Sequence, residues 1–550
     1  MLSLLRLSLP LALVALAGCP VWEPLASCEE FDACSTTDAT TSSGSSGSTV
    51  PTTSAGGGVQ TVTGDDEGTT SSPGTETGVE SDDTGEPADL PEVLTFKLQP
   101  DPITANGPIN VVVTAIHADG VRMETGLGDM VELTPEAGKF VGEIPVLSGL
   151  LNGPHSAFLT PWKAIDGATV PAPYEIALPE PGTEKKYETN DLIGAGQVVA
   201  MATLPTGEPV EFGNHSPDGE QHCFLRMRGK DGFWALADVV DVLPDTPCAA
   251  VDLKIDDQGV LFVVFHQISN NSTRWRLMKI PAWGESPQHM ELGAKDETAV
   301  ALAHHESGAV AVCGTGPTGQ IDKVDAMARI IRPGLATELW AGDYRPTEMA
   351  KQHRFVEQTQ DCVFVDDTLT LVGEANGPHE DEPKNRDRLF ILRLDSAAQT
   401  TAWTVPPPGE QTQSGAQAVD TDEQGNLIVA AYTCDDDCKP AADLRIYDEK
   451  DTLKWQASLG TFPTKQFATQ DLVWSPAGYI VAATGGLKGG EAAFTVRAFS
   501  PSQEEALWTY THSDFQVLQV ALALAIGNYG EVFAGGFGAN GFPAFAFIWG

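Results

Sequence analysis

The sequence predicts an all-β protein in which a seven-bladed β-propeller follows a small β-sandwich and a disordered tether. Three observations predict this architecture. The last two-thirds of the chain repeats a strand–turn–strand pattern seven times. A shorter region before it shows alternating strands of its own, and Ser, Thr, Gly and acidic residues dominate the region before that. We therefore divide the chain into a signal peptide (1–18), a tether (19–90), a β-sandwich (91–181) and a propeller (195–550).

The N-terminus has the layout of an export signal. Arg6 precedes an apolar run that ends at Ala17, which is too short to span a bilayer as a stable helix. The run closes with Leu16-Ala17-Gly18-Cys19, which resembles the lipobox of bacterial lipoproteins. The resemblance implies palmitate and further acyl chains on Cys19, anchoring the protein in a membrane. The alternative is an ordinary signal peptide followed by an incidental cysteine.

The residue after Cys19 bears on the destination of such a lipoprotein. Pro20 stands where the family's sorting rule would require Asp for retention in the inner membrane. The resemblance therefore implies an outer-membrane lipoprotein in the cell envelope of a Gram-negative bacterium. Whether the protein faces the periplasm or the outside stays open.

The segment after the lipobox is expected to act as a tether. No Lys or Arg occurs between Leu7 and Phe96, and clusters such as Asp65-Asp66-Glu67 add negative charge. This composition buries too little apolar surface to offset the entropy of ordering. As a flexible chain, residues 35–90 would span about 40 Å.

The charge balance excludes some partners. The chain has 76 acidic and 32 basic residues, giving a formal charge of −44. Such a field repels phosphate backbones, so we expect no nucleic-acid binding. Two interpretations of the acidity stay open: solubility, or attraction of cationic partners or Ca²⁺.

The cysteines predict disulfides. Nine cysteines minus Cys19 leave eight, an even number in an exported protein. Eight cysteines allow 105 pairings. A zinc site is disfavoured because no second Cys or His pair lies near the last two cysteines. Sequence order suggests the pairs Cys28–Cys34, Cys223–Cys248, Cys313–Cys362 and Cys434–Cys438.

Residues 91–181 read as a β-sandwich. Alternating runs such as 93–98 and 109–115 are separated by turns such as Ala118-Asp119-Gly120. The Gly-Lys-Phe-Val-Gly strand (138–142) before Asn-Gly-Pro-His (152–155) resembles bacterial Ig-like or fibronectin-type modules. The resemblance implies an Ig-like fold, although no Cys…Trp…Cys framework is present.

The repeat of the remaining chain sets the number of blades. Each copy has a strand, a Gly- or Asp-centred turn and a second apolar strand, and successive turns lie 49 to 59 residues apart. All-β units of this length fit the four-stranded blades of a propeller. The turn positions are Gly207, Gly259, Gly308, Asp367, Gly425, Gly478 and Gly530.

Two further positions recur in each copy. A third strand carries an arginine, replaced by Ala546 in the last copy, and a tryptophan follows. The arginines are Arg226, Arg276, Arg329, Arg393, Arg445 and Arg497. The tryptophans are Trp234, Trp283, Trp340, Trp403, Trp455, Trp508 and Trp549.

The core Asp422-Glu423-Gln424-Gly425-Asn426-Leu427-Ile428-Val429 resembles the bacterial SBBP-type seven-bladed propeller repeat. The Arg445-Ile446-Tyr447-Asp448 stretch leading to Trp455 is similar to repeats of pyrroloquinoline-quinone-like propellers. Copies three and four match loosely because charged insertions lengthen them.

The repeated residues are predicted to be structural. The innermost strand of a propeller lines its channel, so arginines on the third strand should lie between or outside the blades and pair with acidic neighbours. The alternative is a ring of arginines that binds a ligand. The tryptophans should wedge between blades. A strand from near residues 187–200 should complete the last blade and remove its free edge.

Chemical motifs are missing from the sequence. It contains no Walker loop, nucleophile elbow, His-Glu-x-x-His or EF-hand. The adjacent His304 and His305 would point to opposite faces of a strand, so a surface position at a turn is favoured over metal binding. We therefore name no catalytic residue, metal site or cofactor.

The leading hypothesis is a monomeric, lipid-anchored envelope protein without catalysis, which presents its propeller to a protein or glycan partner. The main alternative is a propeller enzyme, a polysaccharide lyase or a quinone-dependent oxidoreductase, acting in the central channel. A third possibility resembles the propeller lipoprotein that scaffolds β-barrel insertion. A channel mouth rich in His, Arg and Tyr would favour an enzyme, and a small, apolar channel would favour scaffolding.

Overall fold

The computed structural model describes residues 90–550, apart from 128, 148–151, 190–194, 217–218, 230–239, 244–245, 270–271, 296, 318–323, 332–338, 342–355, 380–381, 395–399, 405–412, 435–439, 463–468, 489–490, 513–518 and 539–541. Within these ranges, the ordered elements are strands, and no helix is long and apolar enough to cross a membrane. The signal peptide, Cys19 and the Cys28–Cys34 pair lie outside the described residues.

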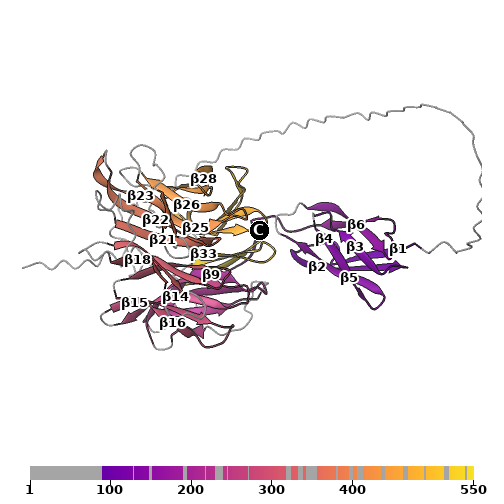
Figure 1. The fold of residues 1–550 in the computed structure, drawn as a ribbon, viewed down its shortest axis with the longest axis horizontal. Helices are drawn as coiled ribbons and strands as arrows, with labels where there is room; N and C mark the ends of the chain where they lie inside the picture. The colour runs from indigo at the N-terminus through magenta and orange to yellow at the C-terminus, as the bar shows by residue number, and fades with distance from the viewer. Residues whose placement is uncertain are drawn as a thin grey trace, which may run out of the picture. The chain divides into compact units, whose positions relative to one another are not determined.

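The first part of the described chain is a seven-stranded β module (Figure 1). Its inner face alternates with a solvent face, as in Ile109, Val111 and Val113, which are buried while their neighbours are more exposed. The strands run in the order β1-β2-β5-β4-β3-β6-β7, so β1, β2, β5 and β4 lie on one side of the order and β3, β6 and β7 on the other. Their bounds are β1 (Glu92–Gln99), β2 (Gly107–Ile116), β3 (Gly120–Glu124), β4 (Met130–Glu136), β5 (Lys139–Val146), β6 (Gly153–Trp162) and β7 (Val170–Ile176).

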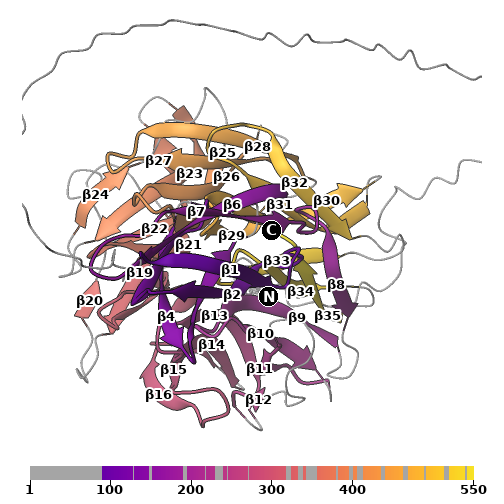
Figure 2. The ribbon, with the colours of Figure 1, turned by 90° about the vertical axis from the view of Figure 1, so that its right-hand side faces the viewer.

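The rest of the described chain forms seven four-stranded antiparallel sheets, the blades of a β-propeller, which confirms the predicted all-β fold and blade count. Figure 2 shows the blades following one another around a ring in chain order. The innermost strands are β9 (Ala195–Thr203), β13 (Cys248–Ile255), β17 (Thr298–His304), β21 (Val356–Val365), β25 (Gln413–Thr421), β29 (Thr469–Ser475) and β33 (Val520–Ile526). The second strands are β10 (Pro209–Ser216), β14 (Leu261–Ser269), β18 (Val310–Pro317), β22 (Thr368–His379), β26 (Leu427–Cys434), β30 (Tyr479–Lys488) and β34 (Val532–Phe537).

The outer half of each blade completes the sheet. The third strands are β11 (His222–Met227), β15 (Ser272–Ile280), β19 (Val324–Ile331), β23 (Glu382–Leu394), β27 (Ala441–Tyr447), β31 (Glu491–Phe499) and β35 (Pro543–Ile548). The fourth strands are β12 (Val240–Asp241), β16 (Gln288–Leu292), β20 (Leu339–Ala341), β24 (Thr400–Thr404), β28 (Leu453–Thr461), β32 (Ala506–His512) and, in the last blade, β8 (Glu184–Thr189).

The last blade is therefore closed by a strand that precedes the first blade in sequence. β8 pairs with β35, with Tyr187 opposite Ala546. A closing strand was predicted near residues 187–200, but it covers only the start of that range, because residues from Ala195 onward form the innermost strand of the first blade. The closure joins the two ends of the repeat and removes a free sheet edge.

The core of the propeller lies between blades. In the described residues, seven hydrophobic clusters each combine side chains from two adjacent blades. The cluster between the second and third blades, for example, contains Phe262 and Trp275 from one blade and Leu302 and Val312 from the next. A single blade cannot bury both faces of its sheet, so the blades stabilise one another.

The predicted turns have the backbone that the sequence requires. All six turn glycines have a positive φ, between 76° and 97°, which a side chain would strain. The fourth blade differs, because Asp366 rather than the predicted Asp367 has the positive φ, at 48°. β21 and β22 are joined there by only two residues, so the left-handed position shifts by one.

Two disulfides join neighbouring blades. Cys223 bonds to Cys248 across the first and second blades, and Cys313 bonds to Cys362 across the third and fourth blades. Both follow the sequential pairing suggested by the sequence. Cys434 is also disulfide-bonded, and its suggested partner Cys438 lies outside the described residues.

Candidate functional site

The centre of the propeller holds a cavity of about 380 Å³ that all seven innermost strands line. Each of these strands contains one extra residue relative to its neighbour, a β-bulge that turns a side chain toward the axis. The bulged residues are Val199, Val251, Val300, Gln360, Gln417, Gln470 and Leu522, and all seven line the cavity. The channel wall is thus set by one repeated backbone irregularity.

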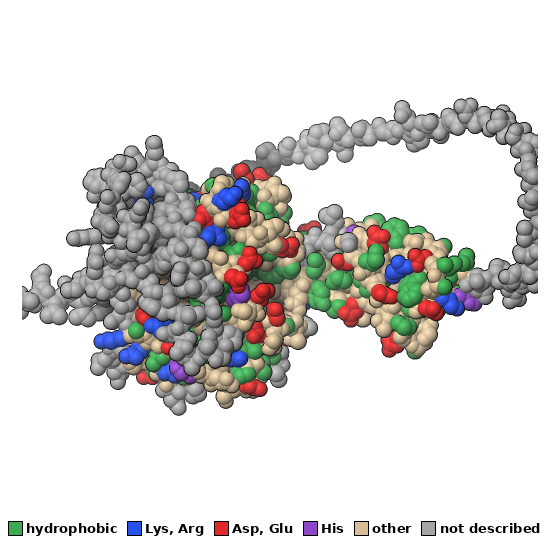
Figure 3. Space-filling view, viewed as in Figure 1, with side chains coloured by type: hydrophobic (Ala, Val, Ile, Leu, Met, Phe, Trp, Pro, Cys, Tyr) green, Lys and Arg blue, Asp and Glu red, His purple; other side chains and the backbone are tan. Residues whose placement is uncertain are grey.

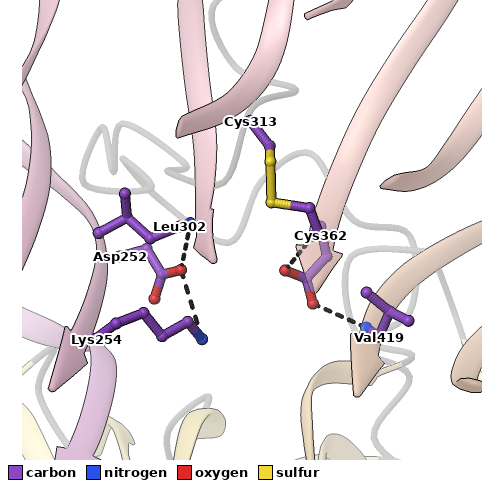
Figure 4. Close-up of a disulfide and its surroundings, with 7 residues drawn as sticks. Asp252, Lys254, Leu302, Cys313, Cys362 and Val419 are labelled. Atoms are coloured by element: carbon purple, nitrogen blue, oxygen red, sulfur yellow. Dashed lines mark hydrogen bonds and ion pairs between the residues drawn. A yellow bond between two sulfur atoms is a disulfide. The ribbon is translucent and has the colours of Figure 1, made fainter. Parts of the chain in front are cut away.

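The residue after the bulge is an aspartate in alternate blades: Asp252, Asp361 and Asp471 in the second, fourth and sixth. One oxygen of each carboxylate accepts the next residue's backbone N–H, at 2.7 to 2.8 Å. The other oxygen accepts a backbone N–H from the following blade, again at 2.7 to 2.8 Å. The three donors in the following blades are the N–H groups of Leu302, Val419 and Leu524. These carboxylates therefore act as bridges between blades (Figure 4).

A fourth carboxylate and a lysine complete the polar wall. Asp420 accepts the Trp474 N–H from the sixth blade at 2.7 Å. Lys254 is the only lysine or arginine among the described residues that line the cavity. Its Nζ lies 3.7 Å from an oxygen of Asp252, and its side chain is 42% exposed because it faces the open cavity. The wall thus carries four carboxylates and one ammonium.

Burial perturbs the ionisation of these groups. Burial raises the pKa of Asp361 to about 7 and that of Asp471 to about 8, although Lys254 opposes the shift. Burial also raises the pKa of Asp420. The pKa of Lys254 is raised, chiefly by the charge of Asp252. The cavity therefore holds protons at neutral pH that free carboxyl groups would have released.

His304 adds an imidazole to the same cavity. Its ring stacks on Phe262 with centroids 5.5 Å apart, and burial lowers its pKa. His305 points elsewhere and lies 2.7 Å from the Ser307 hydroxyl through Nδ1. The two rings thus take opposite directions, as expected for adjacent strand residues. His304 departs from the predicted surface position, because it ends an innermost strand and lines the central cavity.

Other blade junctions are bridged in different ways. Between the first two blades, Asn214 accepts the Ala250 N–H at 2.6 Å. The seventh and first blades are joined by the Thr203 hydroxyl, which donates to the Ile526 carbonyl at 2.8 Å. The third and fourth blades have the Cys313–Cys362 disulfide. With the four aspartates, every one of the seven junctions carries at least one such bridge.

The six repeated arginines lie away from the cavity. All belong to third strands, and none lines the central cavity. Arg393 and Arg497 reach into the fifth blade, whereas Arg226 and Arg445 bond to carboxylates of their own blade. Their partners are Glu211 for Arg226, Gln267 for Arg276, Glu297 for Arg329, Asp451 for Arg393, Asp443 for Arg445 and the Leu459 carbonyl for Arg497.

Three of the repeated tryptophans that the structure describes lie at blade junctions. Trp508 belongs to the cluster between the sixth and seventh blades. Trp455 packs against the cluster between the fifth and sixth blades, and Trp283 packs against the cluster between the first two. The ring of Trp549 lies 4.9 Å from Lys185 Nζ. Trp234 and the side chains of Trp340 and Trp403 lie outside the described parts of the chain.

A buried ionic network holds the closing strand. Arg228 has no exposed surface, and it bonds to Glu211 in its own blade and to Glu188 of β8 at 2.7 Å. Its guanidinium lies 3.8 Å above the centroid of the Phe545 ring. Arg226 bonds to the other oxygen of Glu211 at 2.6 Å, and burial lowers the pKa of Arg226 to about 10. The network joins the first blade to the strand that completes the last one.

Sequence reasoning missed the channel residues and this network. Nothing in the sequence distinguishes the three channel aspartates from other residues of the innermost strands. Their pattern in alternate blades emerges only when the seven copies are aligned on the β-bulges. Among the described residues, no three His, Cys, Asp or Glu side chains lie close enough together to hold a metal ion.

No known protein family and no curated protein matches this chain. Among solved structures, it aligns with an oligogalacturonate lyase in complex with manganese at a TM-score of 0.42 and 10% identity, covering 72% of this chain and 97% of the other. A Penicillium chrysogenum α-L-arabinanase complexed with arabinobiose gives a TM-score of 0.37 and 10% identity, covering 66% and 98%. A Dyadobacter fermentans protein of unknown function gives 0.40 and 9%, covering 67% and 98%.

Likenesses this remote carry no argument about activity. The class rests on the sheet topology of the chain itself: it is a seven-bladed β-propeller protein with a seven-stranded β module before the propeller in sequence. Its channel has a polar wall whose aspartates link neighbouring blades through hydrogen bonds.

Proposed function

We propose that this chain is a lipid-anchored protein of the bacterial envelope that presents its propeller to a protein or glycan partner without catalysing a reaction. The observation that carries the proposal is the use of the channel carboxylates. In Asp252, Asp361 and Asp471, both carboxylate oxygens accept hydrogen bonds from backbone N–H groups, and one of the two donors lies in the next blade. Groups committed in this way stabilise the ring and have little freedom to act on a substrate.

Export is supported by two features. The lipobox-like Leu16-Ala17-Gly18-Cys19 follows an apolar run. The disulfides between blades, Cys223–Cys248 and Cys313–Cys362, form and persist in oxidising compartments such as the periplasm. Both features support the proposed export to a compartment outside the inner membrane.

The β module fits the role of an Ig-like spacer. Its strand order places β1, β2, β5 and β4 together and β3, β6 and β7 together. This order matches the two sheets of constant-type Ig domains. In our proposal, the module and the acidic segment before it hold the propeller clear of the lipid surface.

The second candidate is an enzyme acting in the channel, either a polysaccharide lyase or a quinone-dependent oxidoreductase. It is favoured by the gathering of Lys254 and His304 with two carboxyl groups whose pKa values lie near neutrality. Groups with such pKa values are suited to proton transfer.

One experiment separates the two functions. The mature chain would be incubated with solubilised envelopes and with envelope polysaccharides, and both capture and product formation would be measured. We expect saturable capture of one protein or glycan, without new reducing ends, unsaturated sugars or a bound quinone. Turnover that is lost in His304→Ala and retained in His305→Ala would overturn the binding proposal, because only His304 faces the cavity.

A further inference from the structure

Exposed hydrophobic side chains are concentrated in the small β module. Of the nine exposed large hydrophobic residues among those described, six lie between residues 90 and 165, although the propeller is several times longer. Isolated exposed apolar residues are normal on any protein surface, whereas their concentration in one place marks an interaction surface. Figure 3 shows hydrophobic side chains spread over the surface of this module.

Four of the six lie at one end of the module. Ile116 ends β2 and lies beside Glu92 at the start of β1. The 163–167 loop packs against this start, because a Cβ at Gly167 would collide with the Pro91 carbonyl. We call this set the tip patch, and its members are Leu90, Leu94, Ile116 and Ile165, with exposed fractions of 60%, 50%, 38% and 60%.

The border of the tip patch is amphipathic. The Trp162 ring lies over Gly120 at the end of β6, and exposed Lys163 follows it. Arg122 pairs with Asp166 beside the same loop. Lys and Arg next to exposed aliphatic side chains can keep their charged ends in the headgroup region of a bilayer while their stems cover apolar surface.

We propose that the tip patch contacts the lipid surface of the membrane in which the protein is anchored. The chain enters the module at Leu90, so the patch lies at the end that receives the segment from Cys19. In this proposal the patch adds a weak apolar contact to the acyl anchor on Cys19 and holds the module at the lipid surface. This inference rests on the proposed anchoring, but it concerns a separate contact.

The test removes the acyl chains. The mature chain carrying Cys19→Ser would be mixed with vesicles of phosphatidylethanolamine and phosphatidylglycerol, and the bound fraction would be measured by flotation. We expect weak, saturable binding, reduced about tenfold in L94S/I165S because two aliphatic side chains no longer enter the lipid. The matched control is M130S/F158S, whose residues are equally apolar and exposed but lie beside Glu124, at the other end of β3 from Gly120.

The outcomes are separable. Equal binding by the parent chain and L94S/I165S would overturn the inference, as would an equal loss in M130S/F158S. Self-association of the parent that is lost in L94S/I165S, without vesicle binding, would assign the patch to a second copy of the chain and also overturn it. Because this chain carries no lipid, the result is independent of whether Cys19 is acylated in cells.

Discussion

Replacing Lys254 by Met tests the electrostatics of the channel. Lys254 Nζ lies 3.7 Å from Asp252 and shares the cavity with Asp361, Asp420 and Asp471. Two unit charges at this distance attract by about 4 kcal/mol at an effective dielectric constant of 20 and by about 1 kcal/mol in water. The lysine side chain is 42% exposed. Solvent screening therefore places the expected loss of unfolding free energy nearer the lower value, at about 1–2 kcal/mol.

The loss should depend on pH. The pKa of Lys254 is raised, so the lysine is charged at both pH 5 and pH 8 in the parent protein. The carboxyl groups of Asp361 and Asp471, with pKa values of about 7 and 8, are largely protonated at pH 5 and more ionised at pH 8. Lys254 thus has fewer negative charges to neutralise at pH 5, so we expect Lys254→Met to lower the unfolding free energy more at pH 8 than at pH 5.

The assay is urea unfolding followed by tryptophan fluorescence at pH 5 and pH 8. Lys450→Met is the matched control, because the Lys450 side chain is 79% exposed and its carboxylate neighbour Glu449 is exposed as well. The control should change stability by less than about 0.5 kcal/mol at either pH. An equal loss in Lys254→Met at both pH values would refute the predicted contribution of Asp361 and Asp471, because the loss would then not follow their ionisation.

Three further predictions concern the channel aspartates, the disulfide between the third and fourth blades, and the ion pair at the closing strand. Burial raises the folded-state pKa of Asp361 and Asp471 above the ordinary value of 3.8, so the folded state binds more protons than the unfolded state. The unfolding free energy of the parent protein should therefore fall as pH rises from 4 to 8. Urea midpoints measured over this range should fall less steeply in Asp471→Asn. Cys313→Ala opens a loop of 49 residues between the third and fourth blades and should cost about 2–4 kcal/mol, whereas unchanged melting after reduction would contradict the bridge. Glu188→Gln removes a carboxylate charge that pairs with buried Arg228 and should cost about 2 kcal/mol, with faster amide exchange in β8 and β35. Unchanged exchange in these strands would show that the ion pair does not hold the closing strand.

The fold was predictable because its signals are local and repeated. Turn glycines such as Gly425 need a positive φ, and they mark six of the seven hairpins between the first two strands of a blade. The seven-fold recurrence then fixes the number of blades, which the sheets confirm. In the fourth blade the positive φ lies at Asp366, one residue before the predicted Asp367, because that hairpin is shorter. The length of the hairpin could not be read from the amino-acid composition of the turn.

The channel was much less predictable. A β-bulge leaves no residue signature of its own, since Val199, Gln360 and Leu522 occupy equivalent positions. The partner of Asp361 is a backbone N–H 58 residues away, and a main-chain donor is invisible to side-chain patterns. The buried pair of Arg228 and Glu188 likewise depends on ring closure, which brings residues of the first blade next to β8.

The most direct test of the anchored-display proposal is mass spectrometry of the N-terminal peptide of the protein purified from membranes of a Gram-negative host. The proposal predicts that the mature chain begins at Cys19, carries fatty acyl groups and returns to the soluble fraction in Cys19→Ser. An N-terminal peptide without acyl groups, or a parent chain found wholly in the soluble fraction, would contradict it.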